Sequence, residues 1–317
     1  MPRRKGRASD RPVLLAAGAA MLLSSAATAF AQTIEPNDFL PAPNGTNINL
    51  NYFVFGRQGA FIDPNGTNIP NSSANAYIGV ERFVRFQYLF GHPAGFEVTQ
   101  NFGSISNPTV GGRNLGTASG AANVNLSAFF WPYANFQRKE FLVVSGFLYP
   151  PTGTYNKNQA INFATQYQPS DQYNWTGDVQ IGWEHGIGDR FSYDVAFDAR
   201  IFGDTTGPIQ PGSGIPLSVK TYHNPDYRLQ LWLTWQWNPA LRTAIGYQGF
   251  FGGLDYFSTP QTGTVNTGKS FEQQLRGAVV MFLSPRIQTV LEVNGDVART
   301  GGFKQTFGTI LRFAYIF

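Results

Sequence analysis

Apolar and polar side chains alternate strictly along several stretches of this chain, a pattern typical of β-strands. Residues 191 to 202 give the clearest case, because aromatic and aliphatic side chains fill the odd positions and serine, aspartate and arginine fill most of the even ones. Residues 226 to 237 repeat the pattern, although Trp232 interrupts their polar face. A period of two predicts strands with one face against apolar surroundings and the other against polar surroundings.

Twelve segments have this character, and most approach the roughly 9 to 11 residues with which a tilted strand crosses a bilayer. They are residues 47–55, 76–90, 95–102, 122–131, 138–149, 175–186, 190–202, 226–237, 241–252, 270–283, 286–297 and 305–317. Two segments fit less well. Residues 138–149 are apolar on both faces, and Arg82 falls on the expected outer face of residues 76–90, which predicts a β-bulge or a misplaced boundary there.

The connections between these segments alternate between short and long. One set consists of tight turns rich in Gly, Pro and Asn, and only residues 132–137 are longer. The other set comprises residues 56–75, 103–121, 150–174, 203–225 and 253–269, with residues 298–304 as its single short member. We expect no packed core in loop stretches such as residues 61–73 and 207–216. The sorting predicts an all-β fold, a transmembrane antiparallel up-and-down β-barrel of about 12 strands, with short periplasmic turns and long extracellular loops. A soluble β-sandwich, the main alternative, has no reason to sort its connections.

The chain ends on an alternating strand with one apolar face. That face carries Leu311, Phe313, Tyr315 and Phe317, and no residue follows. A barrel needs such a strand to pair with its first strand, so that no edge remains unpaired. The same four residues are similar to the C-terminal assembly signal that outer-membrane proteins present to the barrel-assembly machinery.

The other end of the chain predicts export. Five basic residues precede an apolar stretch over residues 13 to 23, and Ala29-Phe30-Ala31 is a small-x-small cleavage site. We therefore expect a removed signal peptide at residues 1–31, an N-terminal periplasmic lead-in at residues 32–46 and the barrel at residues 47–317. No stretch supplies the about 20 apolar residues of a transmembrane helix.

Composition agrees with a barrel in lipid. Charged residues make up 13% of the chain, aromatic residues 15%, and the mean hydropathy is −0.19, as expected when half of the strand positions face hydrocarbon and half face a polar lumen. The predicted signal peptide contains five of the 23 basic and one of the 19 acidic residues, so the mature chain carries 18 of each. This balance does not favour nucleic acid as a partner. The chain has no cysteine, so neither a disulfide framework nor a thiolate metal site is expected.

If the apolar stripes face lipid, the opposite stripes carry acids and arginines but no lysine. The expected lumen-lining residues are Glu81, Arg85, Glu97, Asp178, Glu184, Asp194, Asp198, Arg200, Arg228, Arg242, Glu272, Arg276, Glu292, Asp296 and Arg312. Arginine suits multidentate pairing with carboxylates in a crowded interior. Two interpretations remain open, a structural network of salt bridges that fills the barrel and a polar constriction that lines a permeation path. Twelve strands lie between barrels filled by side chains and open porins, so strand number does not decide between them.

Catalytic residues are not indicated. His92, His185 and His223 lie outside any nucleophile elbow or zinc-binding motif. Asp194 and Asp198 share one face of a strand, but paired carboxylates among so many lumenal charges are a weak signal. We expect no cofactor and no metal.

Two short motifs resemble a known family. Residues 40–55 read LPAPNGTNI followed by a strand that ends YFVF, and residues 149–155 read YPPTGTY. Both resemble the outer-membrane family labelled putative meta-pathway of phenol degradation, over about residues 40 to 317. The resemblance implies a transporter-like barrel associated with the catabolism of aromatic compounds, and it carries over no ligand-binding residue.

These observations predict a protein of the outer membrane of a Gram-negative bacterium. We interpret it as a passive channel or facilitator for small molecules, with aromatic or apolar compounds as candidate solutes. The alternatives are a non-transporting structural or surface-interaction barrel with a plugged lumen and, more remotely, an outer-membrane hydrolase. Expected partners are outer-membrane lipid and lipopolysaccharide, the barrel-assembly machinery and a small apolar or aromatic solute.

Overall fold

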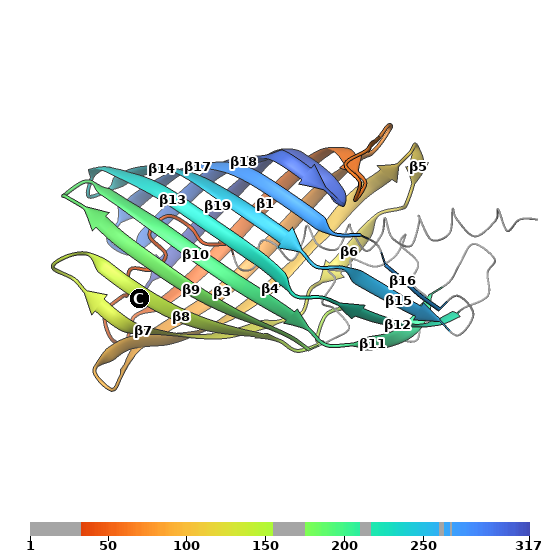
Figure 1. Ribbon diagram of the computed structural model, residues 1–317. Helices are drawn as coiled ribbons and strands as arrows, with labels where there is room; N and C mark the ends of the chain where they lie inside the picture. The colour runs from red at the N-terminus through yellow and green to blue at the C-terminus, as the bar shows by residue number, and fades with distance from the viewer. Residues whose placement is uncertain (1–32, 155–174, 210–216, 260–262, 267) are drawn as a thin grey trace, which may run out of the picture.

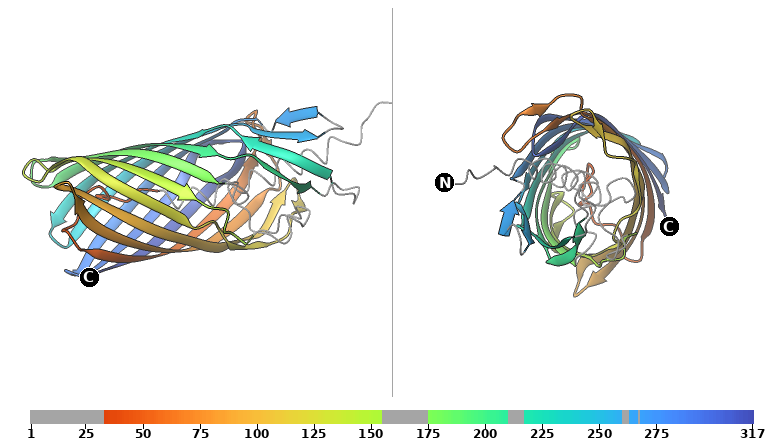
Figure 2. Two further views of the ribbon diagram at one scale, coloured as in Figure 1. Left: turned by 90° about the horizontal axis from the view of Figure 1, so that it is seen from below. Right: turned by 90° about the vertical axis from the view of Figure 1, so that its right-hand side faces the viewer.

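A closed antiparallel β-barrel forms the body of the protein in the computed structural model (Figures 1 and 2). The structure describes residues 33–154, 175–209, 217–259, 263–266 and 268–317, so the predicted signal peptide lies outside the described residues. The wall consists of β1 (Asn47–Ile62), β3 (Ser73–Leu89), β4 (His92–Val110), β7 (Asn125–Asn135), β8 (Glu140–Tyr149), β9 (Thr176–Ile187), β10 (Phe191–Phe202), β13 (Asp226–Asn238), β14 (Leu241–Gly252), β17 (Ser270–Ser284), β18 (Ile287–Thr300) and β19 (Gly302–Ile316). Across the described ranges, no helix is long and apolar enough to cross a membrane.

The twelve wall strands correspond one to one to the twelve predicted segments. Each pairs with its neighbours in chain order, and β19 pairs with β1 to close the sheet. At the seam, the backbone N–H of Asn47 donates to the carbonyl of Phe317 over 2.8 Å, and the N–H of Phe317 donates back over 2.9 Å. The predicted fold class is therefore confirmed, and the last strand closes the barrel. The four aromatic and leucine side chains of its outer face are exposed, while their role as an assembly signal stays a prediction.

Tight turns join the strands at the end of the barrel where the C-terminus lies (Figure 2). Phe90 and Gly91 both have positive φ, at 53° and 83°, as a two-residue hairpin turn requires. The ring of Phe90 is 98% exposed at this tip. The sorting of short turns to one end and long connections to the other is confirmed.

The long connections contain more structure than expected. β1 and β4 continue well beyond their predicted ends, and the short strands β2 (Asn68–Ile69), β5 (Arg113–Asn114) and β6 (Ala118–Ala121) pair with them. A second sheet is formed by β11 (Thr205–Ile209), β12 (Leu217–His223), β15 (Asp255–Thr259) and β16 (Gly263–Asn266). The prediction of plain loops at residues 203–225 and 253–269 was wrong, because hairpin pairing between the two connections satisfies their backbone groups.

The predicted faces of β3 were also wrong. Arg82 points into the barrel, where its guanidinium lies 2.6 Å from the carboxylate of Glu97, whereas Glu81 and Arg85 lie on the outer face, and Arg85 donates to Asn47 over 2.8 Å. The pairing of β3 with β1 and β4 is continuous through Arg82, so no bulge occurs there. The error arose because the inner face of β3 is itself apolar, and an apolar face was expected to point outward.

The closing strand provides a test of the fold. Replacing Phe313, which is 41% exposed on the outer face, with arginine should destabilise the barrel in lipid by up to about 2 to 4 kcal/mol, depending on depth. Phe313→Leu keeps the lipid-facing surface apolar and serves as the control. Urea unfolding in lipid vesicles measures the difference, and equal midpoints for the two variants would contradict the outward orientation of Phe313.

Candidate functional site

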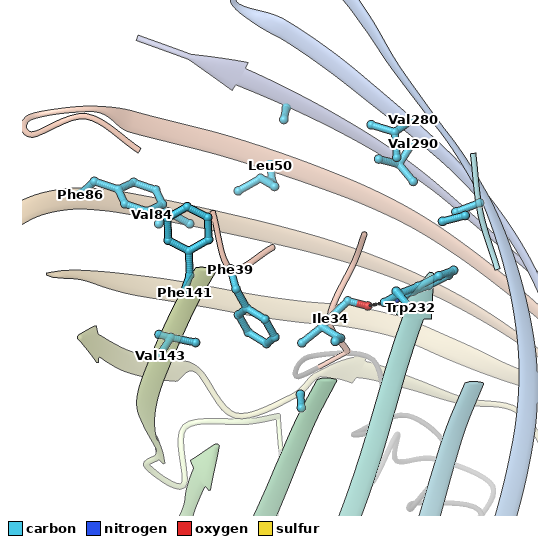
Figure 3. Packing of buried hydrophobic residues seen from close by; sticks show 14 of the residues in the cluster. Ile34, Phe39, Leu50, Val84, Phe86, Phe141, Val143, Trp232, Val280 and Val290 are labelled. Atoms are coloured by element: carbon cyan, nitrogen blue, oxygen red, sulfur yellow. Dashed lines mark hydrogen bonds between the residues drawn. The ribbon is translucent and has the colours of Figure 1, made fainter. Parts of the chain in front are cut away.

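Residues 33–42, here called the inner segment, lie inside the barrel. Ile34, Glu35 and Phe39 are 4%, 1% and 5% exposed, because they are surrounded by side chains of the wall. Figure 3 shows Ile34 beside Trp232 and Phe39 near Phe141. The prediction of a periplasmic lead-in over residues 32–46 was therefore wrong for these residues. The apolar positions of the inner segment find their partners on wall strands distant in sequence.

Two tryptophans of the wall hold the backbone of the inner segment. The indole N–H of Trp232 on β13 donates to the carbonyl of Ile34 over 2.9 Å, and that of Trp131 on β7 donates to the carbonyl of Phe39 over 2.9 Å. The side-chain oxygen of Gln230 accepts the N–H of Ile34 over 3.0 Å. Buried backbone groups need hydrogen-bonding partners. Trp232, the residue that interrupts a polar face in the sequence, supplies one of them for the inner segment.

Two wall glycines make room for aromatic rings. A Cβ atom on Gly182 of β9 would lie 2.4 Å from the ring of Phe39, and one on Gly246 of β14 would lie 2.6 Å from the ring of Trp232. Both distances are too short for a real Cβ contact. Glycine therefore lets the inner segment and its anchoring tryptophan pack directly on the backbone of the wall.

Asn37 forms the polar centre of the inner segment. Its backbone N–H donates to Asp194 over 3.0 Å, and its side-chain amide donates to Glu184 over 2.9 Å and to Ser192 over 2.7 Å. Its side-chain oxygen accepts from Arg242 over 3.0 Å. Its φ of 63° is one that asparagine tolerates better than most residues. Glu184 and Asp194 are direct neighbours across β9 and β10, so the amide lies between two carboxylates and a guanidinium.

Arg276 of β17 links the inner segment to β18. Its guanidinium makes a bidentate pair with Glu292 over 2.8 and 2.7 Å and donates to the carbonyl of Ile34 over 3.1 Å. It also lies over the ring of Trp232, 4.5 Å from its centroid. Bidentate geometry and stacking are both specific to arginine, in agreement with an interior that was predicted to use arginine.

All of the predicted lumen-lining residues other than Glu81 and Arg85 point into the barrel. The ion pairs among them join Arg200 to Asp178, Arg228 to Asp198 and Arg276 to Glu292. Further pairs involve charged residues that the sequence analysis missed, namely Arg82 with Glu97, Arg299 with Glu272, and Arg312 with Asp38 of the inner segment. Arg299 was missed because β18 continues beyond its predicted end. A shift in the pairing of β17 and β18 near Gln274 lies beside it.

A cavity of about 330 Å³ with a mixed aromatic and polar lining lies beside the inner segment. Six aromatic side chains contribute to its wall, namely Phe39, Phe86, Phe129, Trp131, Phe147 and Phe282. The polar part of the lining comprises Thr33, Asn37, Asp38, Arg82, Glu97, Ser145, Gln180, Arg242, Gln288 and Arg312. The inner face of β8, which carries Val143 and Phe147, lines this cavity, and this explains why residues 138–149 are apolar on both faces.

The histidines do not form a catalytic group with the paired aspartates. His185 lies 3.3 Å from Glu140 near the turns, His223 lies 2.7 Å from Asp226 at the far end of the barrel, and His92 packs beside Phe130. Asp194 binds the inner segment, whereas Asp198 pairs with Arg228 over 3.6 Å. In the part of the chain that the structure describes, no three histidine or carboxylate side chains are placed to hold a metal ion.

Comparison with known proteins assigns the chain to a family. The family model described as "Putative MetA-pathway of phenol degradation" matches residues 58–313. The chain belongs to this family. The resemblance seen in the sequence is thereby confirmed, although a comparison with curated proteins gave no match.

Several solved structures share the fold of this family member. The COG4313 outer membrane channel from Pseudomonas putida F1 is 20% identical and has a TM-score of 0.76, over 90% of this chain and 100% of that one. The Ralstonia pickettii toluene transporter TbuX is 11% identical, with a TM-score of 0.50 over 87% and 90% of the two chains. The transport unit of the autotransporter AIDA-I from Escherichia coli is 9% identical, with a TM-score of 0.52 over 96% and 98%. With the apolar outer wall, these comparisons show that the chain has the fold of β-barrels from the outer membrane of Gram-negative bacteria.

The packing of Phe39 on Gly182 can be tested in this barrel. Gly182→Val should displace the ring of Phe39 and loosen the inner segment, because overpacking costs about 1 to 3 kcal/mol. With Ile34→Cys introduced as a reporter, the buried thiol should then react roughly ten times faster or more with a thiol reagent. Gly177→Val on the same strand is the control, since nothing lies within 4 Å of the Cβ position of Gly177. Equal labelling rates in the two variants would argue against the observed seat of the inner segment.

Proposed function

We propose that the protein is a passive facilitator that lets small apolar or aromatic solutes cross the outer membrane through its lumen. The observation that carries the proposal is the aromatic cavity beside the inner segment. Its volume of about 330 Å³ lies within the roughly 300 to 1,000 Å³ of small-molecule pockets, which combine aromatic and apolar side chains with polar groups that orient the ligand. A single substituted ring would fit among the six aromatic side chains.

The chemistry of the cavity supports this class of solute over others. Rings such as Phe129 and Trp131, which pack edge to face at 5.3 Å, offer the offset and edge contacts that aromatic solutes prefer. The guanidiniums at its margin are engaged, as Arg82 is by Glu97 and Arg242 by Asn37. Anions would meet an interior in which carboxylates outnumber arginines, so neutral solutes or cations are favoured. The family description and the toluene named for TbuX point to the same class.

A second function, a barrel with a plugged lumen and no transport, is favoured by the inner segment itself. Trp131, Trp232, Arg276 and the partners of Asn37 hold it across the lumen. The two candidate functions differ in whether solute passes beside the inner segment or stops there. They therefore make opposite predictions for uptake.

Filling the cavity should block uptake if the proposal holds. Ser145→Trp on β8 would project an indole among the lining side chains, and we expect at least a several-fold slower uptake of an alkyl-phenol by vesicles that carry the variant. The vesicles need lipopolysaccharide in their outer leaflet, because small phenols cross simple bilayers unaided. Ser145→Ala, which keeps the cavity open, is the matched control. Uptake equal to that of protein-free vesicles for the wild type would support the plugged barrel.

Loosening the inner segment should widen the path. Replacing Trp131 and Trp232 together with phenylalanine removes two hydrogen bonds, each worth roughly 0.5 to 1.5 kcal/mol, while keeping the aromatic packing. Single-channel conductance in planar bilayers should then rise or become noisier. The outward-facing pair Trp235 and Trp237, changed in the same way, should leave conductance unaltered. Identical traces for the two double variants would show that the inner segment does not limit the path.

A further inference from the structure

A row of polar side chains crosses the outer wall on three neighbouring strands. Asn51 of β1 is paired with Glu81 of β3, and Glu81 is paired with Gln100 of β4. All three lie on the face that also carries Phe53 and Phe83, which are 60% and 37% exposed. Figure 1 shows these three strands side by side in the wall. The row is therefore part of the surface that faces the membrane.

Apolar side chains surround Glu81 and Gln100 of this row, whereas on β1 the next outward side chain on the turn side of Asn51 is the polar Asn49. On β1 and β3 the next outward side chains include Phe53 and Phe83, and on β4 they are Val98 and Phe102, which are 40% and 45% exposed. The ring of Phe102 also covers Gly79, the outward neighbour of Glu81 on β3. Glu81, the charged member of the row, thus lies among apolar side chains.

The hydrogen-bonding groups of this row are only partly used. The amide of Gln100 donates to the carbonyls of Asn101 and Ala122. Among the described residues, however, neither the exposed carboxylate of Glu81 nor the amide of Asn51 has a hydrogen-bonding partner. Polar groups that face hydrocarbon are costly unless they pair. Glu81 offers only acceptors when ionised, and Asn51 offers two donors, so each can satisfy the other across an interface.

We propose that a second copy of this chain covers the row and forms a twofold dimer through the outer faces of β1 and β3. A twofold axis along the membrane normal that passes between Asn51 and Glu81 brings Asn51 of each copy opposite Glu81 of the other. The two amide–carboxylate contacts are then identical, as an isologous interface requires. The apolar residues around them pack against the same residues of the partner, and polar contacts of this kind hold protein segments together in lipid. The proposal is independent of whether the lumen conducts.

Cross-linking in native outer membranes tests the contact directly. The chain has no cysteine, so Phe53→Cys gives it a single thiol, beside the intact row, for a short bis-maleimide. We expect a covalent dimer of twice the chain mass. Ile245→Cys, on β14 and 68% exposed on the outer face, should give none. Absence of the dimer at position 53, or a product with a protein of another mass, would overturn the proposal.

A second measurement separates the polar contact from simple proximity. In lipid nanodiscs, native mass determination should find the wild type and Glu81→Gln as dimers, since an amide can still pair with Asn51, and Glu81→Leu as a monomer. Leucine on a lipid-facing strand leaves folding intact. The control is Gln273→Leu, an outward polar position on β17, which should remain dimeric. A monomeric wild type, or a Glu81→Leu variant as dimeric as the wild type, would exclude the proposed interface.

Discussion

The hydrogen bonds between β1 and β19 are the constraint on which the rest of this molecule depends. A sheet in hydrocarbon cannot leave an edge unpaired, because no water is present to satisfy its N–H and C=O groups. The seam from Ile48 opposite Ile316 to Ile62 opposite Gly302 removes both edges at once. Closure at twelve strands then encloses a lumen wide enough to need filling and narrow enough for one short segment to fill much of it.

The contents of the lumen follow from that enclosure. The inner segment brings its own carbonyls and N–H groups into the interior, where Trp131 and Trp232 donate to its carbonyls and Gln230 accepts an N–H. The apolar face of Phe39 requires apolar wall beside it, so strands near the turns carry valine and phenylalanine inward. Farther from the turns, the wall carries ion pairs such as Arg276 with Glu292. The inner segment therefore meets apolar wall at Phe39 and charged wall at Asn37 and Ile34.

The outer surface of the barrel could be predicted from the sequence because lipid requires apolar side chains on the outer face of every strand. Residues 191–202 alternate without exception on their outer side, and the strand and its faces followed directly. The inner surface obeys no single rule, since what a side chain meets there depends on what fills the lumen. β3 illustrates the difficulty: Val84 and Phe86 face the cavity, whereas Glu81 and Arg85 lie on the outer face. The more apolar face of this strand is therefore the inner one, and the rule that the apolar face points outward failed. The inner segment itself has neither the length nor the period of a strand, and its partners are distant in sequence, such as Asp194 for Asn37.

The function of this barrel is therefore best sought at positions that depart from the pattern of apolar side chains outside and polar side chains inside. Apolar residues on the inner face, such as Val143 and Phe147, mark where the wall contacts the inner segment and the cavity rather than water. Polar residues on the outer face, such as Asn51 and Glu81, mark where the wall meets something other than lipid. Each exception would cost stability in a barrel that served only as a water-filled pore in a uniform bilayer, because it puts the wrong polarity against the solvent on that side. A wall that carries both kinds of exception has two kinds of contact to make, one with what occupies its lumen and one with a protein neighbour in the membrane.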